Sequence, residues 1–289
     1  MKATILLWAG LAVALSGTQD KTYDLKLDPK PVKGHKSEQL EKTSMKMVMK
    51  VNGTPAGGMT DDKVFAAAEE ILAVDADDRT KRRWTFSKAT RLVEGKAVPY
   101  GFQGKTVTMT DAKGKAREFA VEGGGAISEE DLAGLKEAFD DAKVEGKPSG
   151  SELFAPPKPV KAGESWTSDV KKAVQTMFDE EMAAAIDPAK SKLGFTLKSV
   201  ETRAGVEFGK IEGTMELAFT SFGPLKLDQP ILMKFTVDLD ACIDKKLPDG
   251  VMKMKGEMKG KSPATTDAGK IEIEMDMTMD MEKTVKTTK

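Results

Sequence analysis

Apolar and polar residues alternate along much of the chain, most clearly near the C-terminus. There Met252, Met254 and Met258 alternate with lysine and glutamate, and the odd positions from Ile271 to Met281 alternate mainly with glutamate and aspartate. Successive side chains of a β-strand point to opposite faces of its sheet. The pattern therefore predicts a hairpin with one apolar face and one face on which lysines oppose carboxylates. Cross-strand pairs explain that acidic row, so we assign no metal site to it.

The same alternation predicts strands at residues 45–51 and 84–92, and an antiparallel sheet over residues 193–285. Residues 64–74 are ambiguous, because their alanine- and glutamate-rich run favours a helix by propensity. Their length and the aspartate-rich turn that follows suit one arm of a long hairpin instead. We favour the strand, and the helix remains the alternative.

Two segments show helical periodicity. Residues 128–144 begin with Ser128 as N-cap, have three acidic residues in the first turn, and place apolar residues on one stripe. Residues 168–186 carry an apolar face and stop before Pro188. Together these segments predict an α+β fold of two tandem units of mainly antiparallel meander sheet, each with one helix packed on it.

Two proline-rich segments suggest where the units begin. Residues 29–37, the first strap, and residues 157–165, the second strap, share the run Pro-Lys-Pro-Val-Lys and a glycine shortly after it. Proline favours extended backbone and glycine permits a sharp turn, so each strap should be an extended segment that turns into the next element. A chain of 289 residues suits about two domains. We expect units at residues 17–150 and 151–289, related by duplication unless the two straps are alike by chance.

The N-terminus has the pattern of a secretory signal peptide. Lys2 precedes an apolar run over residues 5–15, and the small residues Ser16 and Gly17 follow. Residues 1–16 are therefore expected to be removed on export, which predicts a secreted or periplasmic protein. The run is too short to cross a bilayer and no later one approaches about 20 residues, so we expect no transmembrane span in the mature chain.

Composition excludes several function classes. Lysine and arginine (45) balance aspartate and glutamate (46), with no block of one sign, so a nucleic-acid partner is not expected. His35 and Cys242 are the only residues of their types, so the sequence shows no catalytic triad and no intrachain disulfide. It also lacks a phosphate-binding loop, and we assign no catalytic residue, metal or cofactor. A hydrolase with paired carboxylates stays open, because the sequence cannot nominate the pair.

The 17 methionines are the most unusual feature of the composition. Methionine is the adaptable residue of cores and of promiscuous apolar surfaces, so the methionine face is either a solid core or the wall of a cavity. A cavity between the methionine-rich sheet and the helix at residues 168–186 could take a hydrophobic, lipid-like ligand. Its expected lining is Trp166, Met177, Phe178, Met254, Met275 and Met277.

The second strap continues into Trp166 as the pattern Pro-x-x-Val-x-x-Gly-x-x-Trp. With the signal peptide and the strand around Trp84, this pattern resembles an exported β-rich family of bacterial proteins of unknown function, found especially among planctomycetes. The resemblance implies export and brings no catalytic residues. The sequence thus favours an exported, non-catalytic binding or structural module of the cell envelope, whose partner is an unknown envelope component or a hydrophobic small molecule.

Overall fold

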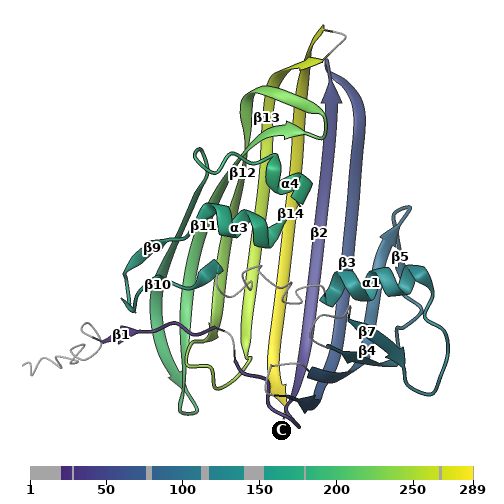
Figure 1. Ribbon diagram of the computed structural model, residues 1–289, viewed down its shortest axis with the longest axis vertical. Coiled ribbons are helices and arrows are strands. Elements are labelled where there is room, and N and C mark those ends of the chain that lie inside the picture. Colours follow the sequence, from purple (N-terminus) through teal and green to yellow (C-terminus); the bar gives the residue numbers. More distant parts are fainter. Residues whose placement is uncertain are drawn as a thin grey trace, which may run out of the picture.

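The computed structural model describes residues 21–288, except positions 28, 76–79, 112–116, 140–152, 179 and 267–268. The predicted signal peptide lies outside the described residues. Figure 1 shows that one tall antiparallel sheet dominates the described part of the chain.

This sheet has twelve strands within the described residues. Ten of them follow one another across the sheet in the order β7, β6, β4, β3, β2, β14, β13, β12, β11 and β10. The short strand β9 pairs with β10 at the far edge, and β5 pairs only with β4. Their bounds are β2 Lys36–Val51, β3 Thr54–Val74, β4 Thr80–Val93, β5 Lys96–Pro99, β6 Thr106–Thr110, β7 Glu118–Val121, β9 Ser165–Thr167, β10 Lys192–Arg203, β11 Val206–Phe222, β12 Leu225–Cys242, β13 Gly250–Thr266 and β14 Gly269–Thr288. Two short strands, β1 Thr22–Tyr23 and β8 Val160–Lys161, pair with each other in a second sheet.

The long strands of the two halves of the chain join directly. β14 pairs with β2 along the whole of β2, from the pair Ile273 and Val51 to the pair Thr288 and Lys36. The predicted α+β fold of two tandem units, each with its own sheet and helix, is therefore wrong, because the fold is mostly β with one large antiparallel sheet. Alternation predicted strands at residues 45–51 and 84–92 and within 193–285, but it carries no information on which strand lies beside which.

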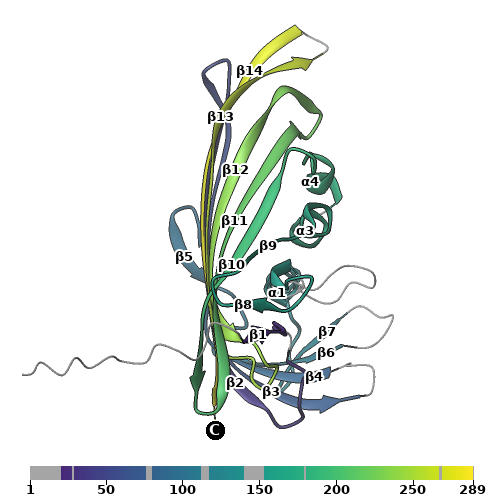
Figure 2. The same ribbon diagram turned by 90° about the vertical axis from the view of Figure 1, so that its left-hand side faces the viewer.

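The described helices all lie on one side of the sheet, which we call the concave face (Figure 2). Helix α1, Glu129–Phe139, falls within the predicted residues 128–144, of which 140–144 lie outside the described residues. The helix predicted at residues 168–186 is two short helices, α3 Val170–Met177 and α4 Glu180–Ala184. Asp169 caps α3 by accepting hydrogen bonds from two backbone N–H groups, and the chain is already extended at Phe178.

Two hydrophobic clusters cover the concave face. The larger cluster lies on β10 to β14 under α3 and α4; in β12 the alternate residues Ile231, Met233, Phe235, Val237 and Leu239 are all buried. The smaller cluster joins β4, β6 and α1. Strand β3 confirms the strand interpretation of residues 64–74.

The opposite, outer face carries the predicted ladder of opposite charges. In β14, Glu274 accepts hydrogen bonds from Lys261 and Lys50 at 2.9 and 3.0 Å, one on each neighbouring strand. Both lysines lower the pKa of Glu274. The ladder favours the observed pairing register of β14 with its two neighbours, because a slip by one residue would bury these charges.

The first strap crosses the concave face at the end of the sheet where β2 begins. Its Gly34 N–H donates to the carbonyl of Ile71 at 2.7 Å, and the Ile71 N–H donates back to the carbonyl of His35 at 3.0 Å. Gly34 has a φ of 83°, which a residue with a side chain rarely adopts. These bonds hold the strap over β3 and so create the roof of the site described next.

Candidate functional site

A cavity of about 480 Å³ lies on the concave face beneath the first strap. Its walls come from segments far apart in the sequence: the strap, strands β2, β3 and β4, the ends of β12, β13 and β14, and residues of α1 and of the segment before the second strap. Cavities of about 300 to 1,000 Å³ with a mostly apolar lining are typical small-molecule sites.

Aromatic side chains form one wall of the cavity. Strand β4 places Trp84 and Phe86 two positions apart on the concave face, where they are 3% and 1% exposed. Phe139 of α1 packs against Trp84 with ring centroids 4.6 Å apart. Phe65 and Phe154 also line the cavity. This wall is apolar and tightly packed around Trp84, which suits a hydrophobic ligand body.

A polar corner interrupts the apolar lining. The Glu69 side chain, in β3, is buried and accepts hydrogen bonds from Ser37 Oγ at 3.2 Å and Gln39 Nε2 at 3.1 Å. Arg82 Nη1, in β4, donates to the other carboxylate oxygen at 3.4 Å. The charge of Glu69 is thus paired and solvated by protein groups, as a buried carboxylate requires.

Arg82 belongs to a polar network that leaves the cavity toward β6 and β7. Its Nε donates to Thr80 Oγ1 at 2.9 Å, and that hydroxyl donates to Asp111 Oδ2 at 3.0 Å. Arg117 Nε donates to the second oxygen of Asp111 at 2.5 Å. The network fixes the direction in which the Arg82 guanidinium points, and Arg117 also lines the cavity.

The Trp84 ring contributes to the aromatic wall, but its indole Nε1 is buried within the protein. This N–H makes no hydrogen bond within the part of the chain that the structure describes.

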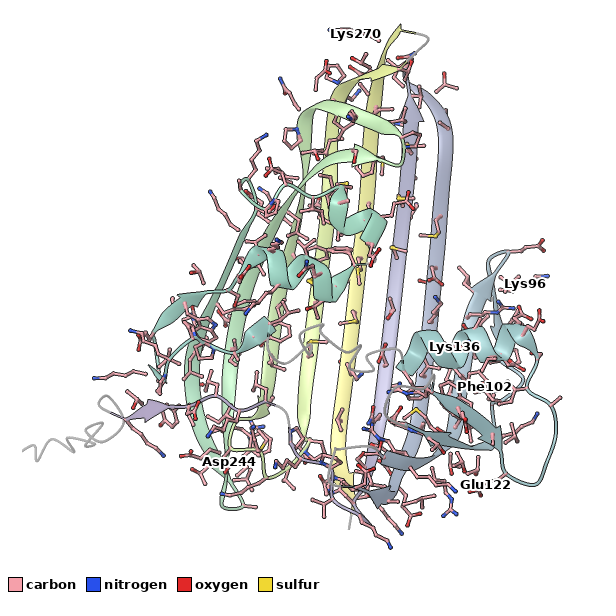
Figure 3. The ribbon with its side chains drawn as sticks, in the orientation of Figure 1. Lys96, Phe102, Glu122, Lys136, Asp244 and Lys270 are labelled. Carbon is pink, nitrogen blue, oxygen red and sulfur yellow. The ribbon has the colours of Figure 1, made fainter. Side chains whose placement is uncertain are left out.

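Ion pairs lie at the other edges of the cavity. Lys283 and Glu41, on the paired strands β14 and β2, are 3.2 Å apart. Lys246 lies 2.7 Å from Asp244, which Figure 3 labels at the lower end of the sheet. Burial raises the pKa of Asp244, but hydrogen bonds from Lys246 and Cys242 outweigh it and hold the value at about 2.

The six residues predicted to line a cavity lie elsewhere on the concave face. Trp166, Met254 and Met275 are buried, and all six belong to or pack against the larger hydrophobic cluster: Trp166, Met177, Phe178, Met254, Met275 and Met277. None of them lines the cavity under the first strap. Figure 3 shows sulfur atoms gathered along the long central strands of this face.

The real lining residues gave little signal in the sequence. Glu69 and Ala67 lie in the alanine- and glutamate-rich run, and Arg82 in a basic segment that resembles any solvated turn. The one usable signal was a charged residue on the face of a strand that otherwise carries apolar residues. Glu69 lies on the same face of β3 as Ala67 and Ile71, which are buried.

Other candidate chemistry receives no support from the described residues. No group of three or more His, Cys, Asp or Glu side chains that could hold a metal ion occurs among them. Cys242 is buried, and its thiol donates to Asp244 Oδ1 at 3.1 Å. Burial raises the pKa of this thiol, which makes it a poor nucleophile. Among the helices described, none has the length and apolarity needed to cross a membrane.

Comparison with known proteins gives only distant similarities. No family model and no curated protein matches the chain. Among solved structures, DynF from the dynemicin biosynthesis pathway of Micromonospora chersina aligns with 10% identity over 94% of this chain and 92% of its own, with a TM-score of 0.19. A DUF1329 family protein from Desulfovibrio piger aligns with 7% identity over 83% of each chain, with a TM-score of 0.16. Scores this low carry no argument about fold or function.

Proposed function

We propose that this protein is a non-catalytic binding protein that carries an amphiphilic, lipid-like small molecule in the cavity under the first strap. The cavity itself supports the proposal: it has an aromatic wall, and polar groups gather at one corner. A few placed polar groups in an otherwise apolar pocket orient a ligand that has one polar end.

The size of the cavity sets the scale of the expected affinity. Burying a methylene contributes about 0.8 kcal/mol, so a ligand that buries ten methylenes gains about 8 kcal/mol. A dissociation constant of 1 μM corresponds to about 8.2 kcal/mol. Part of the gain is offset by the freedom lost on association. We therefore expect micromolar or weaker binding for simple single-chain amphiphiles.

The carboxylates of the lining favour binding over hydrolysis. Glu41 pairs with Lys283, and Glu69 accepts hydrogen bonds from three side chains. A hydrolase needs one carboxyl as acid and a second as base or nucleophile. Two carboxylates that are each held by a cation do not suit that division of roles.

The proposed place of action is the periplasm or the exterior of the cell, in exchange with another component of the envelope. The N-terminal pattern at residues 1–16 supports export. An amphiphile that must cross an aqueous compartment needs a protein that covers its apolar part, which is the task that we propose for this cavity.

Binding of a neutral apolar dye, N-phenylnaphthylamine, tests the proposal through the rise of its fluorescence. Wild-type protein should bind the dye, and Ala67→Phe should abolish or strongly weaken binding, because residue 67 lines the cavity. Ala68→Phe is the matched control, since residue 68 is exposed on the outer face of the same strand. Equal dye binding by both variants, with melting curves that show both folded, would contradict the proposal.

A further inference from the structure

The charged groups of the cavity lining are unbalanced in sign. Two of them are anionic, Glu41 and Glu69, whereas five are cationic: Lys30, Arg82, Arg117, Lys246 and Lys283. The lining therefore sums to +3, with histidine neutral, in a chain whose net charge is −1. Four of the five cations have a carboxylate partner: Arg117 pairs with Asp111, Lys246 with Asp244, Lys283 with Glu41 and Arg82 with Glu69. One positive charge, that of Lys30, therefore remains in excess among the described residues.

Arg82 retains donors for a ligand. Its five N–H groups include one bonded to Thr80 and one in a long 3.4 Å contact with Glu69. Its Nη2 donates to nothing within the described residues, and the side chain is 31% exposed. A guanidinium held by its Nε, with its outer edge open, is suited to bidentate binding of a carboxylate or phosphate.

One further group points to the same chemistry. Lys30, on the strap that roofs the cavity, is exposed and makes no ion pair with any described residue. Its ammonium is a donor that an anionic oxygen would satisfy.

From these observations we infer that the ligand carries an anionic head group, a carboxylate or phosphate, on its apolar body. Arg82 and Lys30 bind the head group, and the aromatic wall covers the apolar body. This inference rests on the proposed function, because it names the head group of the ligand that the cavity binds.

Competition against the bound neutral dye tests the head group separately from the cavity. Three twelve-carbon competitors have the same tail and different charges: dodecanoate, dodecanol and dodecylamine. Wild-type protein should release the dye at a concentration of dodecanoate at least tenfold lower than that of either other compound. Dodecyl phosphate should compete as well as dodecanoate if both anions use the guanidinium.

Variants assign the preference to Arg82. Arg82→Gln should weaken dodecanoate at least tenfold and leave dodecanol unchanged. Arg83→Gln is the matched control, because Arg83 is the next residue of β4 and its guanidinium pairs with Glu70 and Glu122. The double variant Arg82→Gln with Glu69→Gln removes both charges of the pair and serves if the single variant fails to fold. Lys30→Gln should give a smaller loss in the same direction.

The outcomes separate the two ideas. If dodecanol competes as well as dodecanoate in wild-type protein, the anionic head group is wrong while the cavity stands. The inference also fails if the preference survives both Arg82→Gln and the double variant. If wild-type protein does not bind the dye, the proposed function itself fails.

Discussion

Replacing Met275 by aspartate should strongly destabilise the protein. Met275 in β14 is 2% exposed within the larger hydrophobic cluster. Losing the buried thioether side chain costs about 2 kcal/mol. An aspartate there has no partner, and burying it unpaired adds about 1 to 3 kcal/mol even when it is protonated. We expect a total loss of about 3 to 5 kcal/mol, a large share of the stability of an ordinary domain.

Urea unfolding followed by circular dichroism measures this loss against two controls. Met275→Leu keeps the volume and should cost less than about 1.5 kcal/mol. Glu274→Gln changes the neighbouring side chain on the outer face, where it weakens the pairs with Lys261 and Lys50. Surface pairs contribute about 0 to 1 kcal/mol each, so this variant should lose at most about 2 kcal/mol. Equal small losses for Met275→Asp and Glu274→Gln would show that Met275 faces solvent, and the register argument would fail.

Three further predictions concern packing, pH and export. Gly213→Ala should cost about 1 to 3 kcal/mol of stability because a Cβ there meets the Phe195 ring. Gly194→Ala should cost less, since a Cβ at that position is 4.0 Å from its nearest neighbour, the carbonyl oxygen of Trp166. Similar melting temperatures of the two variants would contradict this. Asp244 has a pKa of about 2 in the folded protein against an ordinary 3.8, so its charge stabilises the fold above pH 4. The difference in stability between wild-type protein and Asp244→Asn should therefore shrink as the pH falls toward 2. A difference that stays constant with pH would refute the assignment. Mass spectrometry of exported protein should find a chain that begins just after Ser16, and an intact N-terminus would contradict the predicted signal peptide.

The strands were predictable because their information is local. Period-two alternation identified the long C-terminal strands, and the structure buries Met254, Ile273 and Met275 as the pattern requires. Residues 64–74 also form a strand, as their length and the turn that follows them indicated, despite the helical propensity of their alanines. Packing of a half-buried face is worth more than the few tenths of a kcal/mol by which propensities differ.

The arrangement of the strands was not predictable in the same way. Strand β14 pairs with β2 across more than 200 residues of sequence, and no local pattern in either strand names the other. The methionine faces and charged rows of these strands match, but they match those of β13 equally well. The sequence therefore predicted hairpins correctly and missed the pairing that turns two halves into one sheet.

The helix at residues 168–186 shows a second limit. Its apolar face was predicted, but Phe178 is extended and divides α3 from α4. The Phe178 ring packs edge-on against Phe219 of β11, with centroids 6.3 Å apart. Tertiary packing of one aromatic side chain thus accompanies a break that helical periodicity alone gave no reason to expect.

The two straps make the same pattern of backbone hydrogen bonds but set different side chains against the sheet. In the second strap the Gly163 N–H donates to Leu197, whose N–H donates back to Glu164, which repeats the bonds that Gly34 and His35 make with Ile71. Matching these bonds sets Ser37 opposite Glu69 where the second strap has Trp166 opposite Phe195.

This correspondence accounts for the polar corner in terms of charge. Trp166 and Phe195 pack with ring centroids 6.0 Å apart and belong to the larger hydrophobic cluster. At the first strap, the Ser37 hydroxyl and the Glu69 carboxylate are buried and too polar to stay unpaired there. The carboxylate is stable because Arg82 reaches it from β4, and the donors that Arg82 has left are the ones we propose for the ligand. The buried Glu69 carboxylate therefore requires the cation that we propose as the selector of an anionic ligand.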